Sequence, residues 1–150
     1  MKLSFELDHI GVAVESLSQG KAFYEALGMG PMTIETVESE KVRVGFFETG
    51  NDARIELLEP TSDDSAVAKF LGKRGPGIHH ICLRVSDIRT VMKALKAQGV
   101  QMINDEPKLG AHNCLVAFVH PKSTGGILLE LSQRPGPEPA PALGEGKPHA

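Results

Sequence analysis

Two segments of the chain, residues 8–29 and 79–100, resemble each other when the first is shifted by 71 positions. The shift sets DHIGVAVESLSQGKAFYEALGM above HHICLRVSDIRTVMKALKAQGV, so that His9 meets His80 and Gly28 meets Gly99. Each copy has the pattern of a strand, a short turn and a helix that ends at a glycine. An internal repeat of this kind means that one supersecondary unit is built twice, which restricts the fold more than any other feature of the sequence.

The resemblance continues beyond the helices. VRVGFF matches CLVAFV, and RIELLEP matches LLELSQRP, which aligns Glu56 with Glu130. Between the helix and the last strand of each half the chain has room for two further strands, such as MTIETVE and VRVGFFE in the first half. We therefore expect two βαβββ modules, at about residues 5–60 and 76–133.

The two modules are expected to pair into a single domain that covers residues 1–133. A helix at about residues 63–75, with Asp63 or Asp64 as its N-cap, links them. The fold class is α+β, with one curved mixed sheet and with helices on its outer face. The last segment, residues 134–150, is rich in proline and glycine and is predicted to be disordered.

The charges of the chain are nearly balanced, with a formal net charge of −3 and no cluster of lysines or arginines. Neither a nucleic acid nor an anionic membrane is therefore an expected partner. No apolar run approaches the roughly 18 residues of a membrane span, and the N-terminal segment is too short and too interrupted by charges to form the apolar region of a signal peptide. We expect a cytoplasmic protein whose two cysteines, Cys82 and Cys114, are buried free thiols.

The alternation of apolar residues assigns faces to the repeated strands. In HIGVAV and HICLRV every second residue is a branched aliphatic one, and helices cover a face of this kind. His9 and His80 then lie on the opposite, uncovered face. By the same rule, His79 points to the helix layer or to the sheet edge, because neighbouring side chains on a strand point in opposite directions.

Glu56 and Glu130 occupy the same uncovered face in the strands RIELLEP and GILLELSQ. Glu130 is a lone carboxylate among aliphatic neighbours, which is unfavourable unless something compensates its charge. With the two histidines, these carboxylates could ligate zinc, cobalt, nickel, manganese or iron(II). Taken singly, a histidine in a sheet is more often a hydrogen-bonded structural residue, and a glutamate more often pairs with an arginine such as Arg54 or Arg84.

Two further histidines fall outside the repeat. His120 precedes Pro121 in FVHPKSTGG and has the setting of a turn residue. His112 lies in a glycine-flanked loop, a setting that favours a surface position over one that faces the pocket.

The segments DHIGVAV, IELLEP, GIHHICLRV, DEPKLGAH and FVHPKSTGGILLELSQ resemble the vicinal oxygen chelate superfamily, which includes glyoxalases and bleomycin-resistance proteins. The last two segments resemble one branch of it, the methylmalonyl-CoA epimerases, and the resemblance covers about residues 5–133. It implies metal ligands at His9, Glu56, His80 and Glu130, the set that the strand faces also indicate. The metal it implies is Co²⁺, with Zn²⁺, Ni²⁺ or Mn²⁺ as substitutes.

The reaction that the resemblance implies is epimerisation at C2 of methylmalonyl-CoA, from (2R) to (2S), in propionate metabolism. A proton is abstracted, and a divalent metal chelates the enolate. Glu130 resembles the family glutamate that acts as a catalytic acid/base. Some epimerases carry a second glutamate where this chain has Val44, so that Glu48, Lys108, His112 or a water would have to serve the other face of the substrate.

The loop EPKLGAHN resembles the segment beside the acyl end of the substrate. The residues it implies as substrate contacts are Lys108, Leu109, Gly110, Ala111 and His112. Lys41 and Lys122 are general candidates for contacts to the CoA phosphates.

Three other functions use the same fold. A glyoxalase I-type lactoylglutathione lyase uses similar ligands and enolate chemistry, but its pattern lacks the EPKLGAH loop. An extradiol dioxygenase binds its iron through three protein ligands, and a fourth, anionic ligand would block a coordination position on the metal. A metal-free small-molecule-binding resistance protein binds planar drugs, for which a chain with 5% aromatic residues offers few stacking surfaces. The superfamily also implies a homodimer.

Overall fold

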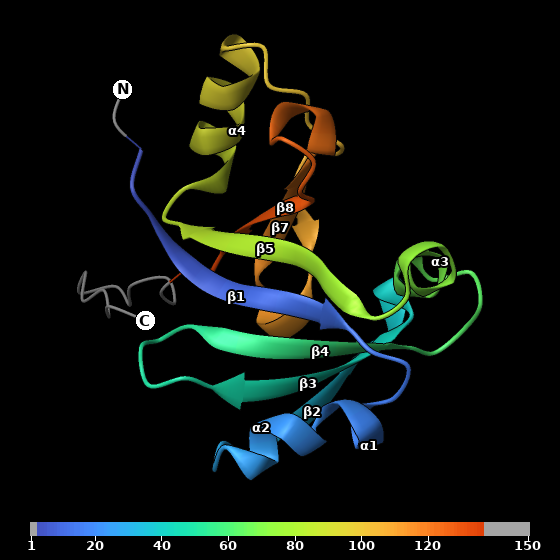
Figure 1. Cartoon of the computed structure of the whole chain (residues 1–150). Coiled ribbons are helices and arrows are strands. Elements are labelled where there is room, and N and C mark those ends of the chain that lie inside the picture. The colour runs from blue at the N-terminus through green and yellow to red at the C-terminus, as the bar shows by residue number, and fades with distance from the viewer. Residues whose placement is uncertain (1–2, 137–150) are drawn as a thin grey trace.

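The computed structural model describes residues 3–136, so residues 1–2 and 137–150 lie outside the described part (Figure 1). Most of the segment predicted to be disordered therefore lies outside it. The first module contains β1 (Phe5–Ala13), α1 (Leu17–Gly20), α2 (Ala22–Ala26), β2 (Thr33–Val37), β3 (Val42–Glu48) and β4 (Arg54–Pro60). Helix α3 (Ala66–Arg74) follows, and the second module contains β5 (Gly77–Val85), α4 (Ile88–Ala97), β6 (Lys108–Leu109), β7 (Leu115–Val119) and β8 (Leu129–Gln133).

Within residues 3–136 the strands form one eight-stranded mixed sheet in the order β2-β3-β4-β1-β5-β8-β7-β6. In each module the first strand pairs with the last in parallel, β1 with β4 and β5 with β8. The two modules meet where β1 and β5 pair antiparallel at the centre of the sheet. The predicted pair of βαβββ modules is thus confirmed, although β6 is only two residues long.

Two helical layers cover the outer face of the sheet. In the first module Leu17 of α1 packs with Phe47 and Leu57. In the second, Ile88 and Met92 of α4 belong to a separate cluster. Both helical segments end at a glycine with positive φ, 92° at Gly28 and 87° at Gly99, as the repeat predicts. Among the described residues, no helix is long and apolar enough to cross a membrane.

Helix α3 lies on the other, inner face of the sheet. Its Val67 packs with Ala13, Val44 and Leu58, which belong to three different strands of the first module. The helix begins with Ser65, whose hydroxyl accepts a hydrogen bond from the backbone N–H of Ala68. The prediction that Asp63 or Asp64 caps this helix was therefore wrong, because the helix begins later than the sequence pattern indicated.

Two bulges interrupt the pairing of β1 with β5. Leu7 pairs with Leu83 and His9 with Cys82, which leaves Asp8 as an additional residue on β1. Further along, Gly11 pairs with His80 and Val12 with Ile78, which leaves His79 as an additional residue on β5. A bulge breaks the alternation of side chains on its strand, so that two neighbours can share a face. The placement of His79 from strict alternation was therefore wrong, as its position in the site shows.

Candidate functional site

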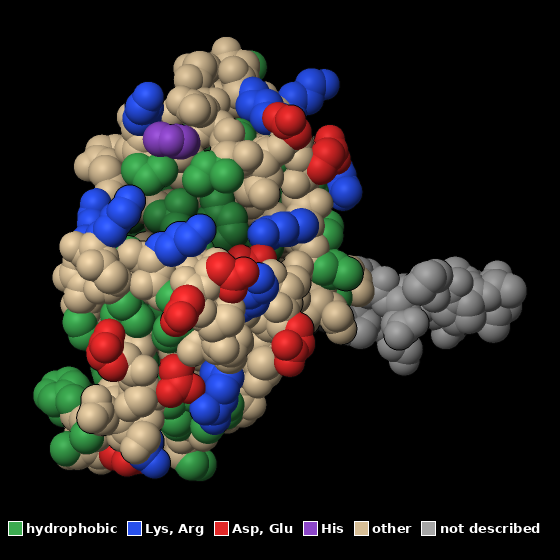
Figure 2. All heavy atoms as spheres, turned by 90° about the vertical axis from the view of Figure 1, so that its right-hand side faces the viewer, with side chains coloured by type: hydrophobic (Ala, Val, Ile, Leu, Met, Phe, Trp, Pro, Cys, Tyr) green, Lys and Arg blue, Asp and Glu red, His purple; other side chains and the backbone are tan. Residues whose placement is uncertain are grey.

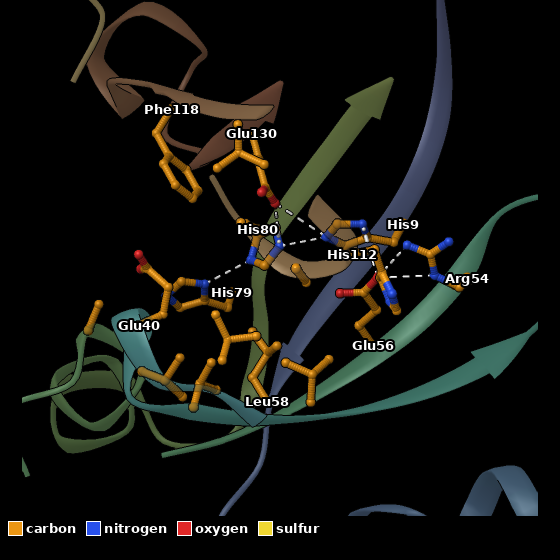
Figure 3. A pocket seen from close by; sticks show the side chains of 18 residues that line it. His9, Glu40, Arg54, Glu56, Leu58, His79, His80, His112, Phe118 and Glu130 are labelled. Atoms are coloured by element: carbon orange, nitrogen blue, oxygen red, sulfur yellow. Dashed lines mark hydrogen bonds and ion pairs between the residues drawn. The ribbon is translucent and has the colours of Figure 1, made fainter. Parts of the chain in front are cut away.

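Three side chains from three central strands converge on the inner face of the sheet (Figure 3). The Nε2 atoms of His9 and His80 lie 2.9 Å apart. The Oε1 atom of Glu130 lies 3.3 Å from Nε2 of His9 and 3.1 Å from Nε2 of His80. All three residues are buried, and their burial indicates that these polar atoms need partners within the protein or a bound ion.

The geometry of this group fits a divalent cation. Metal–nitrogen and metal–oxygen bonds of about 2.1 Å at right angles place adjacent ligand atoms about 3.0 Å apart. The distances among His9, His80 and Glu130 range from 2.9 to 3.3 Å. Two imidazole nitrogens and one carboxylate are also a donor set that transition metals prefer. Three of the four predicted ligands therefore lie together, and we call His9, His80 and Glu130 the ligand group.

The fourth predicted ligand, Glu56, lies beside this group. Its Oε2 atom is 3.2 Å from Nδ1 of His9, and Arg54 donates to the same oxygen from Nη2 at 2.9 Å. Glu56 is buried and lines the same pocket as the other three. In this arrangement its carboxylate faces the Nδ1 side of the His9 ring, whereas the ligand group lies on the Nε2 side.

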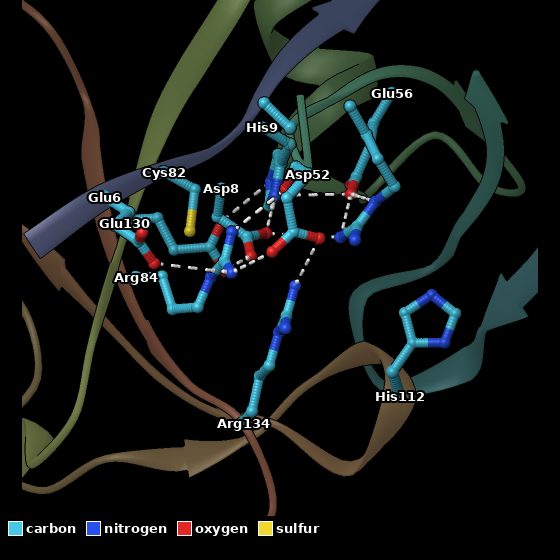
Figure 4. Close-up of polar contacts among 12 residues, drawn as sticks. Glu6, Asp8, His9, Asp52, Glu56, Cys82, Arg84, His112, Glu130 and Arg134 are labelled. Atoms are coloured by element: carbon cyan, nitrogen blue, oxygen red, sulfur yellow. Dashed lines mark hydrogen bonds and ion pairs between the residues drawn. The ribbon is translucent and has the colours of Figure 1, made fainter. Parts of the chain in front are cut away.

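A network of charged side chains contacts the Nδ1 side of the His9 ring through Asp8 (Figure 4). Asp8 Oδ2 lies 2.7 Å from Nδ1 of His9 and accepts from Nη2 of Arg54 at 3.2 Å, and Oδ1 accepts from Nε of Arg84 at 3.1 Å. Arg84 also donates to Asp52, which pairs with Arg134. The hydrogen bond that Nδ1–H of His9 donates to Asp8 orients the ring with Nε2 toward His80.

Sequence reasoning missed Asp8. Strict alternation places it on the face opposite His9, and the bulge turns it to the same face. An acidic residue directly before the predicted ligand His9 was the one signal that could have pointed to it, because a buried carboxylate requires a partner.

The environment shifts the pKa of two of the clustered groups. Burial lowers the pKa of His9, but the contacts with Asp8, Glu130 and Glu56 outweigh burial and raise it to about 9. Burial raises the pKa of Glu130, but hydrogen bonds and charge interactions with His80 and His9 outweigh it and lower the pKa to about 2. Glu130 is therefore a carboxylate at neutral pH, the form that binds a cation or accepts a proton.

His79 lies next to His80 in the same pocket, contrary to the expectation from strand alternation. Its Nδ1 atom is 3.0 Å from Nδ1 of His80, while its ring packs edge-on against Phe70 of α3 at a centroid distance of 5.1 Å. Burial and the neighbouring His80 lower the pKa of His79 to about 4. A neutral His79 fixes the orientation of the His80 ring from its Nδ1 side, which leaves Nε2 for the ligand group.

The absence of a side chain at Gly11 makes room for His80. A Cβ atom at Gly11 would lie 2.3 Å from Cε1 of the His80 ring, far inside the contact distance of two carbon atoms. Gly11 and His80 face each other across the β1–β5 pair. Their pairing explains why a glycine is placed in the middle of a central strand.

The ligand group forms one wall of an open pocket of about 810 Å³, its mouth included. Most of the lining is apolar: Val37, Val42, Val44, Leu58, Ala66, Val67, Val116 and Phe118. Seen from the side of α3, the surface has a hollow of hydrophobic side chains with lysine and arginine side chains around it (Figure 2). An apolar hollow with positive charges nearby suits an anionic ligand that carries an apolar group.

The loop predicted to contact a substrate reaches this pocket in part. Gly110, Ala111 and His112 line it. Lys108 and Leu109 lie outside the lining, where Lys108 pairs with Glu40 at 2.7 Å and Leu109 is exposed.

The two lysines considered for phosphate contacts also lie outside the pocket lining. Lys41 pairs with Asp64, and the backbone N–H of Lys122 donates to the side chain of His120.

Comparison with known proteins gives the following likenesses. The model of the glyoxalase/bleomycin resistance protein/dioxygenase superfamily matches residues 8–118. The ethylmalonyl-CoA/methylmalonyl-CoA epimerase of Cereibacter sphaeroides is 39% identical over 85% of this chain and 96% of its own length. The human mitochondrial methylmalonyl-CoA epimerase is 39% identical over 85% of this chain and 73% of its own. A variant of the Streptomyces coelicolor methylmalonyl-CoA epimerase, solved with 2-nitronate-propionyl-CoA, superimposes with a TM-score of 0.80 at 34% identity, over 89% of this chain and 99% of that one.

Proposed function

Because the chain belongs to the glyoxalase/bleomycin resistance protein/dioxygenase superfamily and, within it, to the methylmalonyl-CoA epimerases, we propose that it interconverts the (2R) and (2S) forms of methylmalonyl-CoA. The observation that carries this proposal is the ligand group of His9, His80 and Glu130 at one wall of an apolar pocket. Epimerisation needs a base beside C2 of the acyl group and a site that stabilises the enolate of the thioester.

The proposed cofactor is a divalent metal ion, with Co²⁺ first and Zn²⁺, Ni²⁺ or Mn²⁺ as substitutes. His9, His80 and Glu130 would hold it, with Glu56 as a fourth ligand after its carboxylate turns from Arg54. Such an ion acts as a Lewis acid that makes the C2 proton more acidic by withdrawing electron density from the thioester carbonyl.

The residues of the chain have separate tasks in this proposal. Glu130, unprotonated at neutral pH, accepts the C2 proton on one face of the substrate. Val44, Leu58 and Phe118 surround the acyl group and exclude water from the enolate. Asp8 and His79 hold the rings of His9 and His80 in their orientations.

The proposed partners are an acyl-CoA substrate and a second copy of the chain. Phe5, Leu7 and Ile78 are 63%, 42% and 60% exposed and lie on the outer face of β1 and β5, since they pair with Val85, Leu83 and Val12. An apolar strip at the centre of a sheet favours a homodimer, which sedimentation of the protein would show or exclude. The cytoplasmic location remains a prediction of the sequence.

Proton exchange tests the proposed function. The protein is depleted of metal with a chelator, reloaded with Co²⁺ and incubated with (2R)-methylmalonyl-CoA in D₂O. We expect the (2S) form to appear together with deuterium at C2, and both to be lost in the depleted protein. Failure of the Co²⁺-loaded protein to exchange C2, together with turnover of a glutathione hemithioacetal, would instead identify a lactoylglutathione lyase.

A further inference from the structure

Arg54 is the only lysine or arginine among the described residues that line the pocket. It lies on β4 two residues before Glu56, so the two side chains are on the same face of the strand. Glu56 is the fourth proposed metal ligand, and its carboxylate is bound to Arg54 instead of lying with the ligand group. A role for Arg54 at this site rests on the proposed function, since it needs the divalent metal ion proposed there.

Arg54 binds Glu56 through two donors. Its Nε and Nη2 atoms donate to Oε2 of Glu56 at 3.2 and 2.9 Å. The two side chains are 19% and 7% exposed, so water competes little with this contact. Hydrogen bonds between a guanidinium and a carboxylate are roughly twice as strong as those between neutral groups. The pair is therefore a favourable position for Glu56, and a metal ion has to compete with it.

The guanidinium of Arg54 is fixed from two further sides. Its Nη2 atom also donates to Oδ2 of Asp8 at 3.2 Å, and its central carbon lies 5.5 Å from the centre of the Phe46 ring. Asp8 is itself held by the network of Figure 4. Because Arg54 is anchored in this way, Glu56 has to leave it in order to reach the ligand group.

Glu56 has one carboxylate oxygen available for a metal ion. Among the described residues its Oε1 atom has no hydrogen-bond partner, and Figure 3 shows this oxygen directed toward the pocket. The Oε2 atom faces Arg54 and lies 3.2 Å from Nδ1 of His9, whereas the ligand group is on the Nε2 side of that ring. A turn of the Glu56 side chain therefore exchanges one cationic partner, Arg54, for another, the ion.

We propose that Arg54 is a positioning residue that competes with the metal ion for Glu56, so that the ligand group binds the ion constantly and Glu56 binds it exchangeably. While Glu56 is on the ion, its carboxylate and that of Glu130 balance the two positive charges. While Glu56 is on Arg54, the ion keeps one positive charge and a free coordination position. Both favour the binding and polarisation of an oxygen of the acyl-CoA substrate.

Co²⁺ binding, measured by isothermal titration, tests this competition independently of activity. Arg54→Met removes the guanidinium and keeps an unbranched side chain that can pack on Phe46. It should bind Co²⁺ about tenfold more tightly than the wild type, because Glu56 no longer has to leave a partner. In a Glu56→Gln background the same substitution should change the affinity by less than about twofold, since no carboxylate is released. Arg54→Lys keeps the charge without the forked donors and should lie between the two.

Two further measurements separate this role from a general effect of charge. Arg84→Met is the matched control, because Arg84 donates to Asp8 at 3.1 Å but does not contact Glu56, and it should not tighten Co²⁺ binding. In Arg54→Met the KM for methylmalonyl-CoA should rise about tenfold while Co²⁺ binds more tightly, since Glu56 then occupies the position that the substrate needs. Damage to the fold would weaken the binding of both.

Three results would overturn the role of Arg54: Co²⁺ binding to Arg54→Met that is no tighter than to the wild type, the same tightening in the Glu56→Gln background, or equal tightening in Arg84→Met. A wild-type protein that binds Co²⁺ but neither exchanges nor inverts methylmalonyl-CoA would refute the proposed function alone, and one that binds no Co²⁺ would refute both. Thermal unfolding establishes that each variant is folded. If Arg54→Met does not fold, Arg54→Lys provides the same comparison in both backgrounds.

Discussion

The Nε2 atoms of His9 and His80 lie 2.9 Å apart, although 71 residues separate them in the chain. Each histidine comes from the first strand of its own module, and the antiparallel β1–β5 pair brings the two together. The ligand group is thus built across the seam between the modules, and its properties can be tested one residue at a time.

His80 and His79 should differ in their effect on metal binding. We expect His80→Ala to abolish Co²⁺ binding because it removes a ligand atom. His79→Ala removes only a contact that orients the ring of His80, and should weaken binding about tenfold. Isothermal titration with Co²⁺ measures both, and equal affinities for the two variants would contradict the separate tasks assigned to them.

Gly11 should be as important for the ligand group as a ligand itself. In Gly11→Ala the new methyl group would lie 2.3 Å from Cε1 of His80, so the ring must move. We expect Co²⁺ binding to be lost, as in His80→Ala. Gly77→Ala is the matched control, since a Cβ atom at this position of β5 meets nothing within 4 Å. If Gly11→Ala bound Co²⁺ like the wild type, the inferred close packing would be wrong.

Asp8 should contribute to stability through its buried contacts. Asp8→Asn leaves Arg54 and Arg84 without the charge that both share, and the loss of one partner from a buried network costs about 3 kcal/mol. For a domain of this size the melting temperature should fall by about 10 °C. Asp64→Asn breaks an exposed ion pair with Lys41 and should leave the melting temperature almost unchanged. Comparable shifts in both variants would argue against the network.

The thiol of Cys82 should be inert in the folded protein. It is fully buried, and burial together with the nearby carboxylates Glu130, Asp8 and Glu56 raises its pKa, so that almost no thiolate forms at pH 8. Cys114, which was also predicted to be buried, is only partly buried, and this burial raises the pKa of its thiol. We expect slow reaction with an aromatic disulfide reagent in buffer and rapid reaction of both thiols in denaturant. Cys114→Ala assigns the residual rate, and fast labelling of this variant in buffer would contradict the burial of Cys82.

The repeat predicted the fold because each match placed a residue in an equivalent position of the second module. Alignment of His9 with His80 and of Glu56 with Glu130 also indicated the inner face on which these side chains lie. The same alternation rule failed at Asp8 and at His79, since a bulge adds a residue to one strand without a signal in the hydrophobic pattern.

The position of His112 could not be predicted for a different reason. It depends on two left-handed residues in a loop and on contacts with β2 and β3, which are far from it in sequence. The orientation of Glu56 depends likewise on whether its carboxylate pairs with Arg54 or turns to the ligand group. Residue patterns do not contain the side-chain rotamers that decide such contacts.

The antiparallel seam between β1 and β5 has a consequence for cooperativity. His9 and Glu56 belong to one half of the molecule, and His80 and Glu130 to the other, so neither half carries a complete donor set. Cobalt affinity therefore reports the docking of the halves as well as the chemistry of the donors. A chain cut in the turn before α3 would form two fragments, and recovery of tight cobalt binding after mixing them would measure their recognition of each other.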